Sequence, residues 1–164
     1  MLDIVIRAAQ PTDFQRIVEL NAEALQHTSV MDLQRLTELD VLSAYHKVLI
    51  VDSCVTAFLL AMRNSAAYSN DNFMFFASRY NRFVYVDRIV VDPAFSGLKI
   101  GSLLYQDLFL YARDNALPIV ACEYNIEPPN EPSRRFHDKF GFTQIGTQWL
   151  DGGKKRVSLQ VATP

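Results

Sequence analysis

The sequence predicts an α/β or α+β fold, in which residues 1–164 form one domain around a single mixed, mostly antiparallel sheet. Segments with apolar residues at helical spacing alternate along the chain with short aliphatic runs that are typical of strands. The chain has 164 residues, of which 49% are hydrophobic. It is therefore long enough to bury one core and too short for two full-sized domains.

Hydrophobic periodicity assigns the elements in order. Strands are expected where polar and apolar residues alternate or where a short apolar run is continuous, at residues 3–8, 47–51, 55–62, 82–91, 118–124, 142–150 and 155–161. Helices are expected where apolar side chains recur three and four positions apart, at residues 12–25, 31–45, 133–140 and, after a glycine-containing turn, within residues 94–117. The pattern thus gives about seven strands and about four helices.

The connections carry the residue types that tight turns and helix ends require. Residues 52–53 join the second and third strands, and residues 151–153 join the last two, so two β-hairpins are expected. Thr12 or Asp13 is expected to cap the first helix, and Gly141 is expected to end the last one.

Charge and composition exclude several classes of partner. Lys and Arg number 16 against 18 Asp and Glu, a formal net charge of −2, so no general attraction to nucleic acid or to an anionic membrane is expected. No apolar stretch is long enough to span a bilayer, and Asp3 and Arg7 interrupt the first apolar residues, so a cytoplasmic protein is expected. Cys54 and Cys122 are expected to be buried free thiols.

Aromatic residues crowd the segment from Tyr68 to Tyr85. One interpretation places most of them in the core, because aromatic side chains at regular spacing are usually buried. The other makes Tyr68, Phe76 and Tyr80 the wall of a substrate pocket. Both interpretations stay open from the sequence.

A strand, a glycine turn and a helix follow one another at residues 86–108. Backbone N–H groups at a helix N-terminus and the helix dipole both favour a phosphate, so the turn at residues 92–101 is a candidate anion site. An ordinary tight turn would carry the same glycines.

Two motifs make the whole chain resemble the GNAT superfamily of acyl-CoA N-acyltransferases. Val91 and Pro93 precede the run S-G-L-K-I-G at residues 96–101, where that family has an (R/Q)xxGx(G/A) turn opening a helix. Asn130 is followed, at the spacing of the second family motif, by Ser133, Phe136, His137 and Gly141-Phe142. The segments YVDRIVV, CEYNIEPPN and FHDKFGF are similar to one bacterial branch of the superfamily. Ser96 and Lys99 depart from the motif, because the family usually has Arg or Gln and a glycine there.

The resemblance implies a sheet splayed at its fourth and fifth strands and acetyl-CoA as the acyl donor. His27 and His46 have no partner at ligand spacing, so no metal site is expected. The resemblance assigns donor contacts to Ile89, Val90, Val91, Ser96, Gly97, Lys99, Ile100, Gly101, Ser102, Asn130 and Ser133. For Asn130, residue chemistry alone equally favours a cap of the proline-containing turn.

The same resemblance implies catalytic roles for two side chains. Asp87 is the candidate general base, with a salt bridge to Arg88 or Arg82 as the alternative. Glu123, on the neighbouring strand, competes for this role and is a candidate substrate contact. His137 stands where the family usually has a tyrosine that protonates the thiolate; the alternative is a solvated histidine on a helix face.

The function that follows is acetyl-CoA-dependent N-acetylation of a small-molecule or amino-acid-like amine by direct transfer. Acetylation of a protein N-terminus or lysine is an alternative, as is a non-catalytic acyl-CoA-binding protein. The last strands of such folds are often used in dimers, so the resemblance also allows a homodimer near Trp149.

Overall fold

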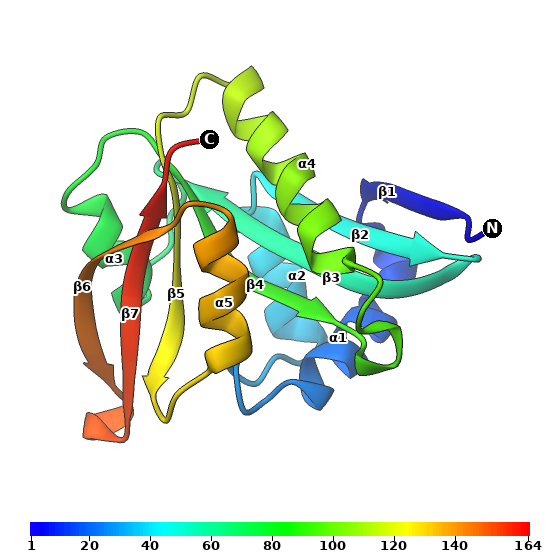
Figure 1. The fold of residues 1–164 in the computed structure, drawn as a ribbon, viewed down its shortest axis with the longest axis horizontal. Coiled ribbons are helices and arrows are strands. Elements are labelled where there is room, and N and C mark those ends of the chain that lie inside the picture. Colours follow the sequence, from blue (N-terminus) through cyan, green and yellow to red (C-terminus); the bar gives the residue numbers. More distant parts are fainter. The chain divides into compact units, whose positions relative to one another are not determined.

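The computed structural model describes residues 1–164, and these divide into two compact units. Unit 1 comprises residues 1–62 and 87–108, and unit 2 comprises residues 63–86 and 109–164. The seven strands follow the order β1-β2-β3-β4-β5-β7-β6 in the sheet (Figure 1). The α/β class and the seven expected strands are confirmed, and there are five α-helices where about four were expected.

Unit 1 holds the first three strands and two helices: β1 (Ile4–Ala8), α1 (Phe14–Glu23), α2 (Leu33–Leu42), β2 (Tyr45–Val51) and β3 (Cys54–Arg63, of which Arg63 already belongs to unit 2). β2 pairs antiparallel with both β1 and β3. The predicted hairpin between β2 and β3 is confirmed. Asp52 and Ser53 have φ values of 46° and 69°, as a two-residue turn of this twist requires.

Side chains that alternate along β2 hold helices on its two faces. Tyr45 and Lys47 both bind the Asp107 carboxylate, at 2.6 and 2.7 Å, so their face carries α4 (Ile100–Asp114). His46, between them in sequence, contacts Asp40 of α2 at 2.7 Å from the opposite face. In unit 1, α2 and the first part of α4 therefore cover opposite faces of the strands (Figure 1).

Unit 2 holds the start of β4 (Val84–Val91), β5 (Val120–Glu127), β6 (Thr143–Leu150), β7 (Lys155–Ala162), α3 (Asp71–Ala77) and α5 (Glu131–Lys139). β7 pairs antiparallel with β5 and with β6. The pairing of β4 with β5 is parallel and covers two residue pairs, Val84 with Val120 and Tyr85 with Ala121. A short pairing of this kind agrees with strands that were expected to splay.

The aromatic stretch forms the core of unit 2. The ring of Phe73 lies 5.7 Å from those of Phe83 and Tyr85, and Phe76 packs against the same two rings. All four side chains are buried. The segment includes α3, which the sequence patterns did not assign; Asn70 caps this helix by accepting a hydrogen bond from the Phe73 N–H.

Three local expectations were wrong. Cys54 is exposed, because it follows the hairpin turn, and only Cys122 is a buried thiol. The Asp13 side chain does not cap α1; its carboxylate binds the guanidinium of Arg7 and the N–H of Gln10. The second helix ends at Leu42 rather than near residue 45, since β2 begins there.

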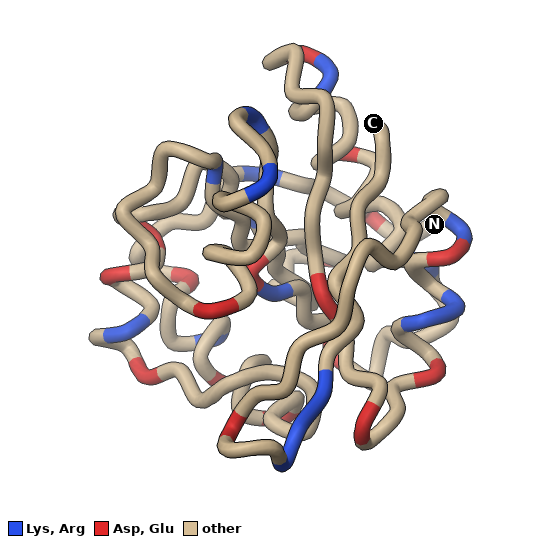
Figure 2. The backbone as a smooth tube through the Cα atoms, turned by 90° about the vertical axis from the view of Figure 1, so that its left-hand side faces the viewer, with Lys and Arg blue, Asp and Glu red and all other residues tan.

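Acidic and basic residues are interspersed along the backbone (Figure 2). No helix combines the length and the apolar character needed to cross a membrane.

Gly146 in β6 gives a test of packing in unit 2. A Cβ at this position would lie 2.8 Å from Cζ of Phe75, whose ring also contacts the Arg79 guanidinium and the Phe76 ring. We expect Gly146→Ala to lower the free energy of unfolding by about 1–3 kcal/mol, measured by urea denaturation. The loss should shrink when Phe75 is replaced by Leu; an equal loss in both backgrounds would contradict this explanation.

Candidate functional site

The exit of β4 in unit 1 is fixed by Asp92. One carboxylate oxygen accepts the N–H of Ala94 at 2.9 Å and caps the short turn Pro93–Phe95. The other oxygen forms a 2.6 Å ion pair with Arg16 of α1. Two independent partners thus set the direction in which the chain leaves the strand.

The turn that follows presents a row of backbone donors. None of the N–H groups from Gly97 to Ser102 donates to a backbone carbonyl, and the first helical hydrogen bond runs from Leu103 N–H to the Lys99 carbonyl at 3.1 Å. These groups lie at the N-terminus of α4, a helix of 15 residues. Free N–H groups and the positive end of a helix dipole together favour a phosphate or diphosphate.

Lys99 adopts a backbone conformation that glycine reaches most readily. Gly97 has φ 86° and Lys99 has φ 58°, so both are left-handed. Lysine reaches this conformation at a cost of roughly 1–2 kcal/mol compared with glycine. Ser96 and Lys99 are exposed, whereas the Ile100 side chain is buried and anchors the start of α4.

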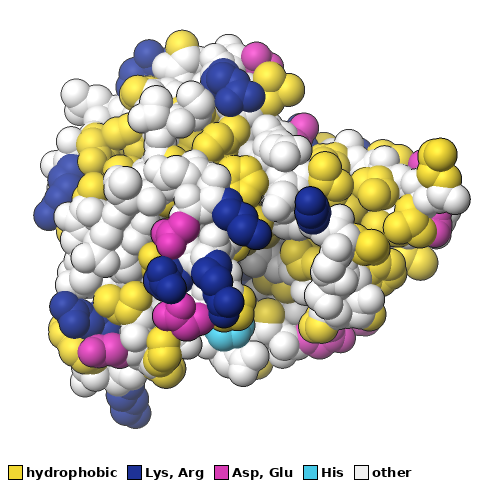
Figure 3. Space-filling view, in the orientation of Figure 1, with side chains coloured by type: hydrophobic (Ala, Val, Ile, Leu, Met, Phe, Trp, Pro, Cys, Tyr) yellow, Lys and Arg dark blue, Asp and Glu magenta, His cyan; other side chains and the backbone are white.

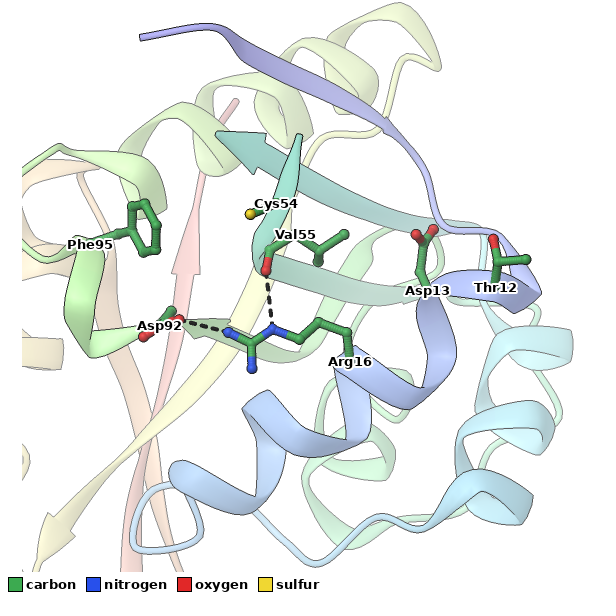
Figure 4. Close-up of a pocket in the computed structure, with 7 residues that line it drawn as sticks. All are labelled: Thr12, Asp13, Arg16, Cys54, Val55, Asp92 and Phe95. Atoms are coloured by element: carbon green, nitrogen blue, oxygen red, sulfur yellow. Dashed lines mark hydrogen bonds and ion pairs between the residues drawn. The ribbon is translucent and has the colours of Figure 1, made fainter. Parts of the chain in front are cut away.

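A cavity of about 490 Å³ lies beside this turn in unit 1 (Figure 4). It is lined by Thr12, Asp13, Arg16, Cys54, Val55, Asp92 and Phe95. Arg16 donates to the Asp92 carboxylate and, at 3.2 Å, to the Val55 carbonyl, and Asp13 is bound by Arg7. The charged side chains that line this cavity therefore already pair with other groups of the protein.

Asp87 and Arg88 form an ion pair inside unit 1. Arg88 Nε lies 2.8 Å from Asp87 Oδ2, and only 6% and 2% of the two side chains are exposed. Arg82, the other cation considered for this pairing, donates instead to the carbonyl of Asn115. The salt bridge is thus present, and the role of Asp87 as a base stays a prediction.

The end of β4 directs alternate N–H groups to its two sides. The N–H of Asp92 bonds to the Thr56 carbonyl of β3 at 2.8 Å. Successive N–H groups along an extended chain point in opposite directions, so the N–H of Val91 points away from β3. The Val90 side chain is buried, and those of Ile89 and Val91 are half-buried.

In unit 2, Glu123 is held by a tyrosine that sequence reasoning did not connect to it. The Tyr85 hydroxyl lies 3.0 and 2.8 Å from the two carboxylate oxygens, and the Tyr85 ring is fully buried. A carboxylate held by a rigid phenol has a defined orientation. Contact of Glu123 with a substrate stays a prediction.

Asn130 stands at the start of α5, and Ser133 and His137 follow at successive turns of the helix. The Asn130 side chain accepts the Ser133 N–H at 3.2 Å, so it caps the helix. His137 Nδ1 donates to the Ser133 carbonyl at 2.7 Å. The expected alternative of a solvated histidine was wrong, because His137 is 4% exposed.

Burial decides the charge of His137. It lowers the pKa of the imidazole below 6.5, although the hydrogen bond to the Ser133 carbonyl opposes this shift. The ring is therefore neutral at pH 7, with its hydrogen on Nδ1. Protonation of a thiolate by His137 would need a second ring proton; this role stays a prediction.

Charged side chains of both signs lie side by side over α5 (Figure 3), where Arg134 pairs with Glu131 and Asp138.

The three aromatic residues proposed for a pocket wall differ in exposure. Phe76 is fully buried and packs in the core, as the first interpretation expected. Tyr68 is 8% exposed, and its hydroxyl accepts from the Asn70 side chain at 3.1 Å. Tyr80 is half-buried. Contact of any of them with a substrate stays a prediction.

Comparison with known proteins identifies the family. The model of the acetyltransferase (GNAT) family matches residues 48–142, which include the strand, the turn and the start of α5 described above. The chain belongs to the acetyltransferase (GNAT) family. A phosphinothricin N-acetyltransferase of Streptomyces coelicolor is 41% identical over 69 residues; this match covers 41% of the chain and 37% of the relative.

Solved structures with GNAT-like folds match nearly the whole chain. Ard1 from Thermoplasma volcanium has a TM-score of 0.78 with 17% identity, over 98% of this chain and 97% of that one. YncA from Salmonella typhimurium, solved with its cofactor acetyl-CoA, has a TM-score of 0.70 with 22% identity, over 98% and 93%. At this level of identity, the likeness shows a shared fold and does not indicate which substrates this chain binds.

The two buried histidines predict acid sensitivity of this GNAT chain. Burial lowers the pKa of His46 as it does that of His137, and His46 Nε2 is buried without a partner. Below pH 6.5 the unfolded chain therefore binds more protons than the folded one, so the free energy of unfolding falls as the pH drops. Urea denaturation at several pH values should show this slope.

Substitution identifies the groups responsible. His46→Gln and His137→Gln should each flatten the slope, whereas His27→Gln, at an exposed position, should leave it unchanged. A slope that persists in the double variant His46→Gln/His137→Gln would assign the effect to other groups.

Proposed function

We propose that this protein transfers an acetyl group from acetyl-CoA to the amine of a small molecule, without a covalent enzyme intermediate. The observation that carries the proposal is the row of unpaired N–H groups from Gly97 to Ser102 at the start of α4. This row lies within residues 48–142, which the model of the acetyltransferase (GNAT) family matches. Acetyl-CoA supplies the thioester carbonyl that an amine attacks.

The residues of unit 1 fit the donor. The N–H groups of the turn suit its diphosphate, and the side chain of Lys99 adds a positive charge beside them. The edge of β4 from Ile89 to Val91 suits the extended amide arm, which can bond to a strand edge as an added strand does. Because the N–H of Val91 points away from β3, it is available to polarise a carbonyl.

Transfer forms a C–N bond and breaks the C–S bond, so the amine loses a proton and the sulfur gains one. Asp87, on the same strand as Val91, is our candidate to accept the amine proton, directly or through water. Glu123 is the competing base, and His137 is the candidate acid. Asn130 and Ser133 remain candidate contacts of the donor.

The acceptor is proposed to be a small molecule because the relative that shares 41% identity over 69 residues is a phosphinothricin N-acetyltransferase. Most of the aromatic residues between Tyr68 and Tyr85 pack in the core of unit 2. The half-buried Tyr80 is our candidate acceptor contact in this segment.

A thiol-release screen tests the function. The protein is mixed with acetyl-CoA and a panel of amines, amino acids and short peptides, and free thiol is measured together with acetylated product. We expect equal amounts of both with one class of small amine. Release with peptides alone would favour acetylation of protein N-termini or lysines. Measurable CoA binding without release would contradict an enzyme and favour a non-catalytic binder.

Gly97→Val tests the placement of the diphosphate. Valine strongly disfavours the φ of 86° found at this position, so the N–H groups of the turn should lose their alignment. We expect the Kd of CoA, measured by calorimetry, to rise about tenfold or more.

Gly152→Val is the matched control, because Gly152 has φ 65° and both glycines have open space where a Cβ would stand. It lies in the turn between β6 and β7 and should lower stability without changing the Kd. Equal Kd changes in the two variants would contradict the placement.

Cys122→Ala tests direct transfer. Cys122 is 2% exposed in an apolar strand, where a thiol is a poor nucleophile. We expect kcat to stay within about twofold of the wild type, since no acetyl-thioester on the enzyme is needed. Cys54→Ala, at the exposed thiol, is the control. Loss of turnover in Cys122→Ala, with fold and CoA binding intact, would indicate a covalent route.

A further inference from the structure

Arg88 is a buried cation of unit 1 whose guanidinium donates four hydrogen bonds. Its Nε donates to Asp87 Oδ2 at 2.8 Å. One terminal nitrogen donates to Asn21 Oδ1 and to the Ser29 carbonyl, each at 3.1 Å, and the other donates to Ser29 Oγ at 3.0 Å. The side chain is 6% exposed.

The partners of Arg88 come from three places in the chain. Asp87 is on β4, Asn21 is on α1, and Ser29 is in the loop between α1 and α2. Asn21 also donates from its amide nitrogen to the Ser29 carbonyl at 2.9 Å. The Arg88 guanidinium therefore connects the Asp87 carboxylate to the loop that contains Ser29.

Only a planar guanidinium can serve these partners together. Its donors form a fixed fork, whereas a lysine ammonium is a compact charge with three rotatable donors. One oxygen of the Asp87 carboxylate is therefore held by a side chain whose other bonds point to α1 and to the loop.

We propose that Arg88 is a positioning residue of the transfer reaction, which holds the Asp87 carboxylate in its working orientation by anchoring to Asn21 and Ser29. The inference rests on the proposed acetyl transfer with Asp87 as the base. Arg88 does not exchange a proton in this scheme. Its contribution is to restrict the rotation of the carboxylate, on which the rate of a proton transfer depends.

A double-mutant cycle on kcat separates positioning from simple stabilisation. Arg88→Lys keeps the charge and loses the fork, and we expect kcat to fall about tenfold or more, with a changed pH profile and a nearly unchanged Kd for CoA. In the Asp87→Asn background the same substitution should cause little further loss. These variants are assayed at alkaline pH as well, where the amine is already neutral and no base is needed to deprotonate it before attack, so the fall in kcat should be smaller there.

Ser29→Ala provides the same test without changing the buried charge. Ser29 is exposed, so this variant should fold, and it removes the acceptor of one guanidinium nitrogen. We expect a fall in kcat of about threefold to tenfold when Asp87 is present and none when it is Asn.

Arg7→Lys is the matched control. Arg7 forms a two-bond ion pair with Asp13 at 2.7 and 3.0 Å in the same unit, and its replacement should lower stability without affecting kcat or its pH profile. Equal losses from Arg88→Lys and Ser29→Ala with and without the Asp87 carboxylate would overturn the proposal, as would wild-type kcat in Arg88→Lys.

Hydrogen exchange of the loop at residues 24–32 gives a readout that does not require turnover. Exchange should accelerate in Arg88→Lys and Ser29→Ala and stay unchanged in Arg7→Lys; unchanged exchange in all three would overturn the anchoring. If the wild-type protein releases no thiol with any amine, the proposed function fails while this measurement still tests the anchor. If the wild type does turn over but the effects of Arg88→Lys and Asp87→Asn on kcat are additive, the positioning role of Arg88 is rejected and the proposed function stands.

Discussion

Unpaired backbone N–H groups at the start of α4 are the constraint on which the functional interpretation depends. Groups of this kind need a partner from water or from a ligand, because the helix itself cannot supply one. The residues around them keep the turn in shape: Asp92 fixes the exit of β4, Arg16 holds Asp92, and Ile100 buries the first helical side chain. The donors therefore stand in place before any ligand arrives, which reduces the ordering cost of binding.

This arrangement explains how a nearly neutral chain can hold a polyanion. The formal net charge is −2, and no cluster of lysine and arginine is required for the turn to bind phosphate, since backbone dipoles do not enter the charge count. The substitution of Lys for glycine at position 99 is compatible with this view. The backbone there adopts the left-handed conformation despite the side chain.

Local chemistry allowed much of the fold to be predicted from the sequence. Two of the predicted features depend only on neighbouring residues: the hairpin turn at Asp52 and Ser53, and the helix end at Gly141. All three residues have the positive φ that such turns and helix ends require. Helix α3 was missed because its short aromatic sequence fits a strand as well as a helix. The exposure of Cys54 was missed because its apolar sequence neighbours suggested burial, whereas its place directly after the hairpin turn leaves it open to solvent.

The candidate site shows the same division. The turn at residues 97–102 could be read from its glycines and its family motif. The partners of Arg88 could not, because Asn21 and Ser29 lie 67 and 59 positions away and carry no pattern that links them to a strand. The burial of His137 likewise depends on rings brought to it by folding, among them those of Tyr124 and Phe142. Contacts between residues that are far apart in the chain are therefore the part of the site that one sequence predicts least well.

We propose that backbone amides from Gly97 to Ser102 hold the diphosphate of the donor. Amide chemical shifts recorded by NMR during titration with CoA test this placement residue by residue. We expect the resonances of these six residues to move in proportion to saturation, with the largest shifts at the start of α4. Saturable CoA binding that leaves these resonances in place would contradict it.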